Sequence, residues 1–227
     1  MSHPVLISRT EEDAAPLVAA LSERGVDSIV WPALRFEARP VGDDIVARLG
    51  NANALAVVSP RAMRFLAAAL GEDQPDTPVF AQGEATAAAA PQLRALPARG
   101  PYAEDLAQRI IEQCDPGLVI RLCGDRARDQ LVDALASAGF RTESIVLYDN
   151  VTPPNMTRQP RPLRAAIFHS PSAVERQLAA NPWLREVPAV AIGRTTAEAL
   201  HSSDHPRVIV AASPAIAAIA ETLEQIP

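Results

Sequence analysis

Short apolar runs alternate with amphipathic segments along the whole chain. The first apolar run covers residues 5–8, and residues 11–24 follow with leucine and valine at the spacing of one helix face. Gly25 suits the cap at the C-terminus of that helix, and residues 28–31 form the next apolar run. The chain therefore opens with a predicted β-α-β unit, which implies a parallel sheet and a right-handed crossover.

The segment 187–200 has the clearest local pattern in the chain. Four apolar residues suit a strand buried on both faces, and Gly193 then allows a sharp turn of the backbone. Thr195 or Thr196 is a suitable N-cap for a helix that we expect to begin at Ala197. The pattern predicts a strand, a turn with hydroxyl groups, and a helix.

The same pattern occurs earlier in the chain. In residues 78–89, Gly83 and Thr86 each precede their counterparts by 110 positions. Two Ser-Pro pairs, which are strong helix-start signals, begin at Ser59 and Ser170, with an offset of 111. The sequence thus contains one repeat of roughly 110 residues, present twice, each copy having the size of a small α/β domain.

The rest of the chain continues the alternation of strand and helix. An alanine-rich helix is expected after Gly83, stopping near Pro91. The other predicted helices cover residues 43–49, 61–70, 102–113, 128–138 and 215–225, and the other predicted strands cover 54–58, 79–82, 118–121, 144–148, 165–169 and 207–211.

Two proline-bounded segments differ from the buried strands. Residues 32–40 alternate apolar and charged side chains, and residues 144–154 occupy the equivalent place in the second copy. If each segment crosses between domains, residues 1–36 and 151–227 form a discontinuous first domain and 41–147 form the second. Residues 37–40 and 148–150 then belong to a linker ladder.

The composition narrows the function classes. The net charge is −6, so the sequence indicates no basic face for nucleic acid. All 21 basic residues are arginine. Two cysteines and four histidines show no metal-ligand spacing, and we expect no metal. No signal peptide or membrane-spanning run is recognisable, which predicts a cytoplasmic protein with no membrane partner.

The residues that repeat also carry a resemblance. The opening segment 5–34, the two S-P-x-A turns, the two G-x-x-T-A turns and the segment ESIVLYDNV together resemble the uroporphyrinogen-III synthase family. The resemblance implies two flavodoxin-like α/β domains joined by a two-stranded antiparallel ladder. It implies that the substrate is hydroxymethylbilane, a linear tetrapyrrole with eight carboxylates. The enzyme would remove its terminal hydroxyl, invert ring D through a spiro intermediate and close the macrocycle, with no cofactor.

The resemblance also suggests site residues. Tyr148 matches the family's tyrosine and is the candidate acid that assists hydroxyl loss, in an auxiliary role; a half-buried strand aromatic is the competing interpretation. Helix N-termini at the carboxyl ends of strands suit carboxylates, and Arg9 lies at such an end. The candidate substrate-binding residues are Arg9, Ser59, Thr86, Ser170, Thr195 and Thr196.

Alternative interpretations remain open at this point. Each hydroxyl residue could be an ordinary N-cap, and solvation is the default for Arg126, Arg128 and Arg194. His169 is expected to be a packing residue. The competing functions are a non-catalytic tetrapyrrole-binding or regulatory protein and a two-lobed small-molecule receptor. We expect a monomer whose small-molecule partner is its substrate, hydroxymethylbilane. A transient contact with the enzyme of the preceding step is compatible with this expectation.

Overall fold

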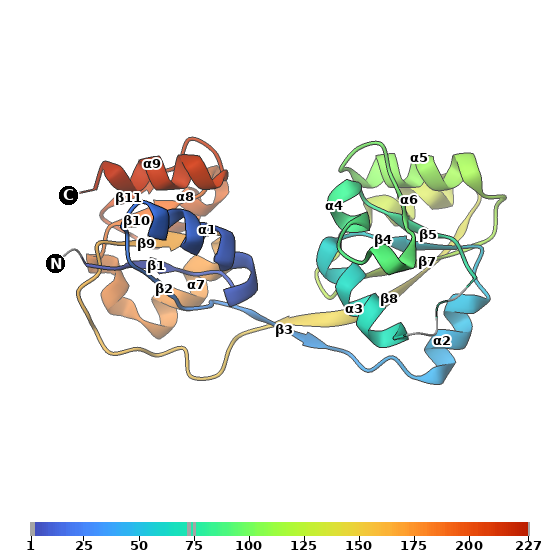
Figure 1. Cartoon of the computed structure of the whole chain (residues 1–227), viewed down its shortest axis with the longest axis horizontal. Helices are drawn as coiled ribbons and strands as arrows, with labels where there is room; N and C mark the ends of the chain where they lie inside the picture. The colour runs from blue at the N-terminus through green and yellow to red at the C-terminus, as the bar shows by residue number, and fades with distance from the viewer. Residues whose placement is uncertain (1–2, 72–73, 75, 227) are drawn as a thin grey trace. The chain divides into compact units, whose positions relative to one another are not determined.

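The computed structural model describes residues 3–71, 74 and 76–226, and within it the chain divides into two compact units. The terminal unit consists of Met1–Arg35 and Val151–Pro227, and the central unit consists of Phe36–Asn150. Both are α/β units in which a mainly parallel sheet is covered by helices on both faces (Figure 1).

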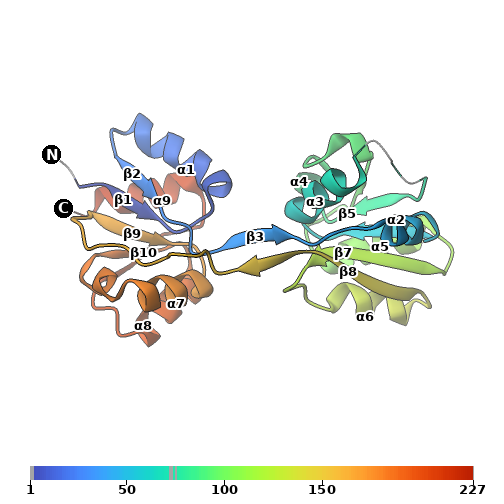
Figure 2. The same cartoon turned by 90° about the horizontal axis from the view of Figure 1, so that it is seen from below.

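The terminal unit has a five-stranded sheet in the order β11-β10-β9-β1-β2, of which Figure 2 labels β10, β9, β1 and β2. Each pair of neighbouring strands in this sheet is parallel. The strands are β1 (Val5–Ile7), β2 (Ser28–Val30), β9 (Ala165–Phe168), β10 (Ala189–Ala191) and β11 (Val208–Val210). The helices are α1 (Glu11–Glu23), α7 (Pro171–Ala180), α8 (Arg194–Ser202) and α9 (Ile216–Glu224), with a 3₁₀ turn η2 (Pro182–Glu186).

Two helix layers bury the sheet of the terminal unit. Val5 and Ile7 pack towards α1 and α9, while Leu6 packs towards α7 and α8. Alternate residues of a strand point to opposite faces, so a strand covered on both sides must be apolar throughout. This explains why β1 and β9 are continuous apolar runs rather than alternating ones.

The central unit has a six-stranded sheet in the order β3-β8-β7-β4-β5-β6. The pairs from β8 to β6 are parallel. The strands are β3 (Arg35–Ala38), β4 (Ala54–Val57), β5 (Val79–Ala81), β6 (Leu96–Pro97), β7 (Leu118–Gly124) and β8 (Arg141–Val151). The helices are α2 (Asp43–Gly50), α3 (Pro60–Leu70), α4 (Glu84–Ala87), α5 (Ala103–Gln113) and α6 (Gln130–Ser137), with a 3₁₀ turn η1 (Pro91–Leu93).

The central sheet is likewise buried on both faces. Helix α3 packs Met63 and Leu66 on one face, and helices α5 and α6 cover the other. At the edge, β3 lies beside β8, where the Arg39 backbone N–H donates to the Leu147 carbonyl at 2.8 Å. The Arg39 guanidinium also forms a two-pronged pair with Asp149, at 2.9 and 2.6 Å.

Two helices differ from the sequence-based prediction at the glycine turns. Helix α8 begins at Arg194 rather than Ala197, because the extended backbone of Gly193 supplies the N-cap; neither Thr195 nor Thr196 is that cap. The alanine-rich helix after Gly83 is a single turn, α4, with Gly83 as its N-cap in place of a threonine.

Two further differences concern the region after β7. Helix α6 begins at Gln130 rather than at residue 128, because the Arg128 carbonyl accepts a hydrogen bond from Arg121 at 2.7 Å instead of starting the helix. The second proline-bounded segment does not start a separate strand, since β8 runs without interruption from Arg141 to Val151.

Candidate active site

Each sheet has one point where the chain order reverses. In the terminal unit this point lies between β1 and β9, and in the central unit it lies between β4 and β7. Ligands of open parallel sheets bind beyond the carboxyl ends of the strands at such a switch point. The residues that follow these four strands are therefore the first candidates for a binding site.

The central unit has a hollow at its switch point. A cavity of about 230 Å³ is lined by residues after β4 and β7, and both Ser59 and Tyr148 contribute to its wall. A second cavity of about 420 Å³ shares Val58 and Ala127 with the first. The two cavities thus lie side by side along one edge of the sheet, and two of the predicted site residues meet there.

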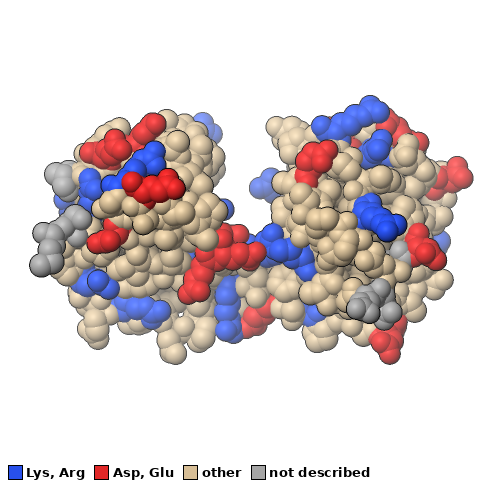
Figure 3. Space-filling model, in the orientation of Figure 1, with Lys and Arg blue, Asp and Glu red and all other residues tan. Residues whose placement is uncertain are grey.

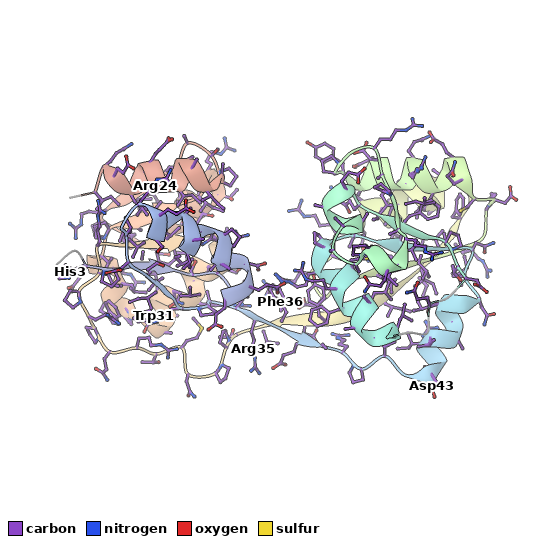
Figure 4. All side chains as sticks on the ribbon, in the orientation of Figure 1. His3, Arg24, Trp31, Arg35, Phe36 and Asp43 are labelled. Carbon is purple, nitrogen blue, oxygen red and sulfur yellow. The ribbon has the colours of Figure 1, made fainter. Side chains whose placement is uncertain are left out.

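Tyr148 is held in place by aromatic residues of the central unit. Its ring stacks on Phe65 of α3 at a centroid distance of 5.0 Å and meets the edge of Phe36 at 5.5 Å. Phe36, labelled in Figure 4, follows Arg35 in β3, and the Arg61 guanidinium lies over its ring, 3.6 Å from the centroid. Aromatic pairs in these geometries restrict the position of the tyrosine ring.

Gly124 completes the seat of Tyr148. A Cβ atom added at Gly124 would lie 2.5 Å from the Cε2 and Cζ atoms of the tyrosine and 2.8 Å from its hydroxyl oxygen. The backbone of Gly124 is not in the left-handed region, so glycine is required here by the close approach of the ring and not by φ. The hydroxyl end of Tyr148 therefore lies directly against the end of β7.

Ser59 is the N-cap of α3. Its hydroxyl accepts a hydrogen bond from the Ala62 backbone N–H at 3.1 Å, and Pro60 occupies the first helical position. The N-terminus of a helix carries partial positive charge and unpaired N–H groups, both of which favour an anionic ligand. Ser59 is thus the N-cap that the Ser-Pro pair predicts, and it also lines the cavity that contains Tyr148.

Thr86 is buried rather than open to the cavity. It is 2% exposed, and its hydroxyl donates to the Gln82 carbonyl at 2.9 Å. Its counterpart Thr196 is 3% exposed, whereas Thr195 is exposed. Both copies of the repeat therefore bury this threonine in the first turn of the helix, and of these three threonines only Thr195 presents its side chain to solvent.

The switch point of the terminal unit combines Ser8, Arg9, His169 and Ser170. Ser170 caps α7 by accepting from the Ala173 N–H at 3.2 Å. The Ser8 hydroxyl joins the two strand ends: it accepts from the His169 N–H at 3.3 Å and lies 3.4 Å from His169 Nδ1. Arg9 is exposed beside them.

His169 is held in its neutral form. Burial, together with the nearby positive charge of Arg9, lowers the pKa of its imidazole to about 3. Its Nε2 atom is buried without a hydrogen-bond partner among the described residues. The prediction that His169 is a packing residue agrees with this burial.

Sequence reasoning missed Gly124 and Phe36 as parts of the site. The sequence around each of these residues does not indicate a role, because each contacts the Tyr148 ring from a strand beside β8. It also missed Thr10, which caps α1 by accepting from the Asp13 N–H at 3.3 Å and donating to the Asp13 carboxylate. Here a signal was available, since threonine followed three residues later by an acid is a capping pattern.

A larger hollow of about 1370 Å³ lies in the terminal unit, at the amino ends of the strands and opposite the switch-point side. It is lined by residues at the amino ends of the strands, such as Leu163 and Val208. The guanidinium of Arg164, which lines this hollow, donates hydrogen bonds to the Leu223 and Ile226 carbonyls. Because this hollow lies away from the carboxyl ends of the strands, its size does not make it the better candidate site.

The visible surface is mixed in charge, and the described residues form no cluster of metal ligands. Figure 3 shows acidic and basic side chains interspersed on the visible face of each unit. In residues 3–71, 74 and 76–226, no group of three or more His, Cys, Asp or Glu side chains could hold a metal ion. Within the same residues, no helix is both long and apolar enough to cross a membrane.

Comparison with known proteins adds the decisive observation. A family model described as uroporphyrinogen-III synthase HemD matches residues 15–221. The chain belongs to the uroporphyrinogen-III synthase family. Uroporphyrinogen-III synthase is a cyclising lyase of tetrapyrrole biosynthesis, and this is the activity that the family assigns to the chain.

Solved uroporphyrinogen-III synthases share the fold. A mutant enzyme from the extremely thermophilic bacterium Thermus thermophilus aligns with a TM-score of 0.62 and 19% identity, covering 99% of this chain and 98% of that one. The enzyme from Helicobacter pylori 26695 aligns with a TM-score of 0.64 and 19% identity, covering 96% and 97%. No sequence among the curated proteins matches the chain.

Proposed function

We propose that the chain converts hydroxymethylbilane to uroporphyrinogen III with Tyr148 as the acid that assists loss of the terminal hydroxyl. The observation that carries this proposal is the cavity that Tyr148 shares with Ser59 at the switch point of the central unit. A proton donor and a helix N-terminus then serve one substrate: the donor acts at the hydroxyl, and the helix terminus attracts carboxylates.

The chemistry requires modest help at the hydroxyl and strict control of geometry. The nitrogen lone pair of the terminal pyrrole expels the hydroxyl, and the proton from the Tyr148 phenol lets it leave as water. The substituted α-carbon of ring D attacks the methylene of the resulting cation and forms the spiro intermediate. The bond from that carbon to the methylene of ring C then breaks, and this methylene bonds to the free α-carbon of ring D, which inverts the ring. The proton that this carbon loses on closure returns to the phenolate. Holding the flexible chain folded is the larger contribution, because unassisted closure gives the uninverted isomer.

For the remaining binding residues, the support differs from one to the next. Exposed Arg9 and the Ser170 cap are suited to carboxylates at the switch point of the terminal unit. The exposed side chain of Thr195 is compatible with direct contact. Buried Thr86 and Thr196 would act indirectly, by fixing the first turns of α4 and α8. The hydroxyl of Thr86 already donates to the Gln82 carbonyl.

We further propose that the two units are flavodoxin-like domains and that β3 and β8 form the antiparallel ladder between them. The strand order of the terminal unit, read from β2 to β11, supports the first part because it is 2-1-3-4-5 in that unit's own chain order. The Arg39–Asp149 ion pair supports the pairing of β3 with β8, because it joins the residue after β3 to a residue of β8. A cytoplasmic, monomeric protein, with at most transient contact with the preceding enzyme, remains our expectation.

The deciding experiment is incubation with freshly made hydroxymethylbilane, followed by separation of the type I and type III isomers after oxidation. We expect type III product at a rate proportional to protein concentration. Type I product alone, at the rate of a protein-free control, would contradict the proposal. Tight binding of the product without turnover would instead indicate a non-catalytic tetrapyrrole-binding protein.

A further inference from the structure

Arg121 is a buried arginine in the middle of β7. It is 7% exposed, on the face of the sheet that α5 and α6 cover. A charged side chain in such a place is stable only when its donors are paired. Arg121 Nε donates to the Ser144 hydroxyl at 2.9 Å, Nη1 to the Arg128 carbonyl at 2.7 Å and Nη2 to the Asp129 carboxylate at 3.1 Å.

Two of these partners lie in the loop between β7 and α6, residues 125–129. The other end of the loop is anchored to β8: the Asp125 N–H donates to the Tyr148 carbonyl at 3.1 Å, and the Asp125 carboxylate accepts from the Asn150 N–H at 3.1 Å. The loop is therefore fixed at its first residue by the backbone of β8 and at its last two by the guanidinium of Arg121.

This loop forms the wall between the two cavities at the carboxyl edge. Ala127 lines both cavities, Arg126 lines the one that contains Tyr148, and Arg128 lines its neighbour. The Arg126 side chain is 57% exposed, and its Nε lies 4.0 Å from the Asp125 carboxylate. At this distance and exposure the ion pair is weak, so a ligand carboxylate can compete for the charge of Arg126. The position of the loop thus sets the shape of the wall and the direction of two cations.

We propose that Arg121 is a positioning residue for the substrate carboxylates. Its guanidinium does not line either cavity; it holds residues 125–129 so that Arg126 and Arg128 meet the carboxylates of the linear tetrapyrrole. The identity of the ligand rests on the proposed function, whereas the anchoring of the loop does not. A preorganised pair of cations binds a polyanion more tightly than a mobile pair, because less conformational entropy is lost on binding.

The first test measures the loop directly. Trypsin cleaves after arginine, and a loosened loop would expose the bonds after Arg126 and Arg128 in the native protein. We expect Arg121→Met and Asp129→Asn to be cut there at least about tenfold faster than wild type. Asp129 is 74% exposed in its side chain, so its substitution leaves the core intact. Asp133→Asn, the same charge change on exposed α6 surface, is the control and should match wild type.

The second test separates positioning from general stability. Both variants should raise KM for hydroxymethylbilane about tenfold while kcat changes less than about threefold. In a background of Arg126→Gln with Arg128→Gln, adding Arg121→Met should no longer raise KM, because no cations remain to be positioned.

The outcomes distinguish this inference from the proposed function. An unchanged KM and cleavage rate in both variants, with wild type still giving type III product, would overturn the positioning role. A fall in thermal stability with unchanged KM would reduce Arg121 to a packing residue and also overturn it. Absence of type III product from wild type would instead overturn the proposed function, and the proteolysis would still decide whether Arg121 anchors the loop.

Discussion

Replacement of Gly124 by alanine tests whether the place of the Tyr148 hydroxyl matters for turnover. The added methyl group would lie 2.5 Å from the Cε2 and Cζ atoms of the ring, far inside van der Waals contact. To restore an ordinary separation, the ring must retreat by about 1 Å. It is held by the stacked Phe65 and by the edge of Phe36, so the movement also disturbs these contacts.

The size of the effect follows from these contacts. Overpacking of this kind costs about 1–3 kcal/mol of the free energy of unfolding, which corresponds to a fall in Tm of roughly 2–12 °C. A misplacement of about 1 Å in a reacting group can cost about 10²-fold in rate. We therefore expect Gly124→Ala to lose at least as much turnover as removal of the hydroxyl itself.

The assay is type III formation under saturating substrate, with a thermal melt of each variant. Gly50→Ala is the control, because an added Cβ at the end of α2 meets no atom within 4 Å and alanine favours a helix. In a Tyr148→Phe background, Gly124→Ala should still lower Tm, since the ring remains, but should remove little further activity. Full turnover in Gly124→Ala with a Tm equal to that of the control would refute the reasoning.

The remaining predictions concern single side chains. Tyr148→Phe should lower kcat by about 10²-fold or less, with KM and Tm near wild type, because the ring still packs and only the donor is lost; full turnover would remove Tyr148 from the mechanism. Ser59→Asp should keep the cap of α3 and hence Tm, but raise KM severalfold because its carboxylate repels a polyanion; a wild-type KM would argue against carboxylates at this helix. In wild type, lowering the pH from 7 to 5 should reduce the free energy of unfolding by up to about 2 kcal/mol through His169, and His169→Gln should abolish this loss. Unfolding of both proteins at both pH values measures it. The sign follows because the depressed pKa of folded His169 makes the unfolded chain bind the extra proton in this window, so stability falls as the pH falls; an identical pH dependence in the variant would contradict it.

Local features of this protein were predictable because neighbouring residues determine them. The caps at Ser59 and Ser170 follow from a serine before a proline, and the buried strands follow from unbroken apolar runs. The predicted helix boundary was wrong where a residue from another strand forms a hydrogen bond with the start of the helix. Helix α6 starts late because Arg121 takes the Arg128 carbonyl, and no residue near 128 signals this.

By itself, the sequence determined the alternation of strand and helix, the repeat of roughly 110 residues and the hydroxyls at the helix starts. The proline-bounded segments also suggested domains that combine both copies of the repeat, but only the tertiary structure decided which strands are neighbours, with β1 beside β9 and β4 beside β7. It alone placed Tyr148 against Gly124 and buried Thr86 and Thr196. The physical reason is range: periodicity and capping act within one or two turns, whereas strand order and the seat of a side chain depend on packing between residues far apart in the chain.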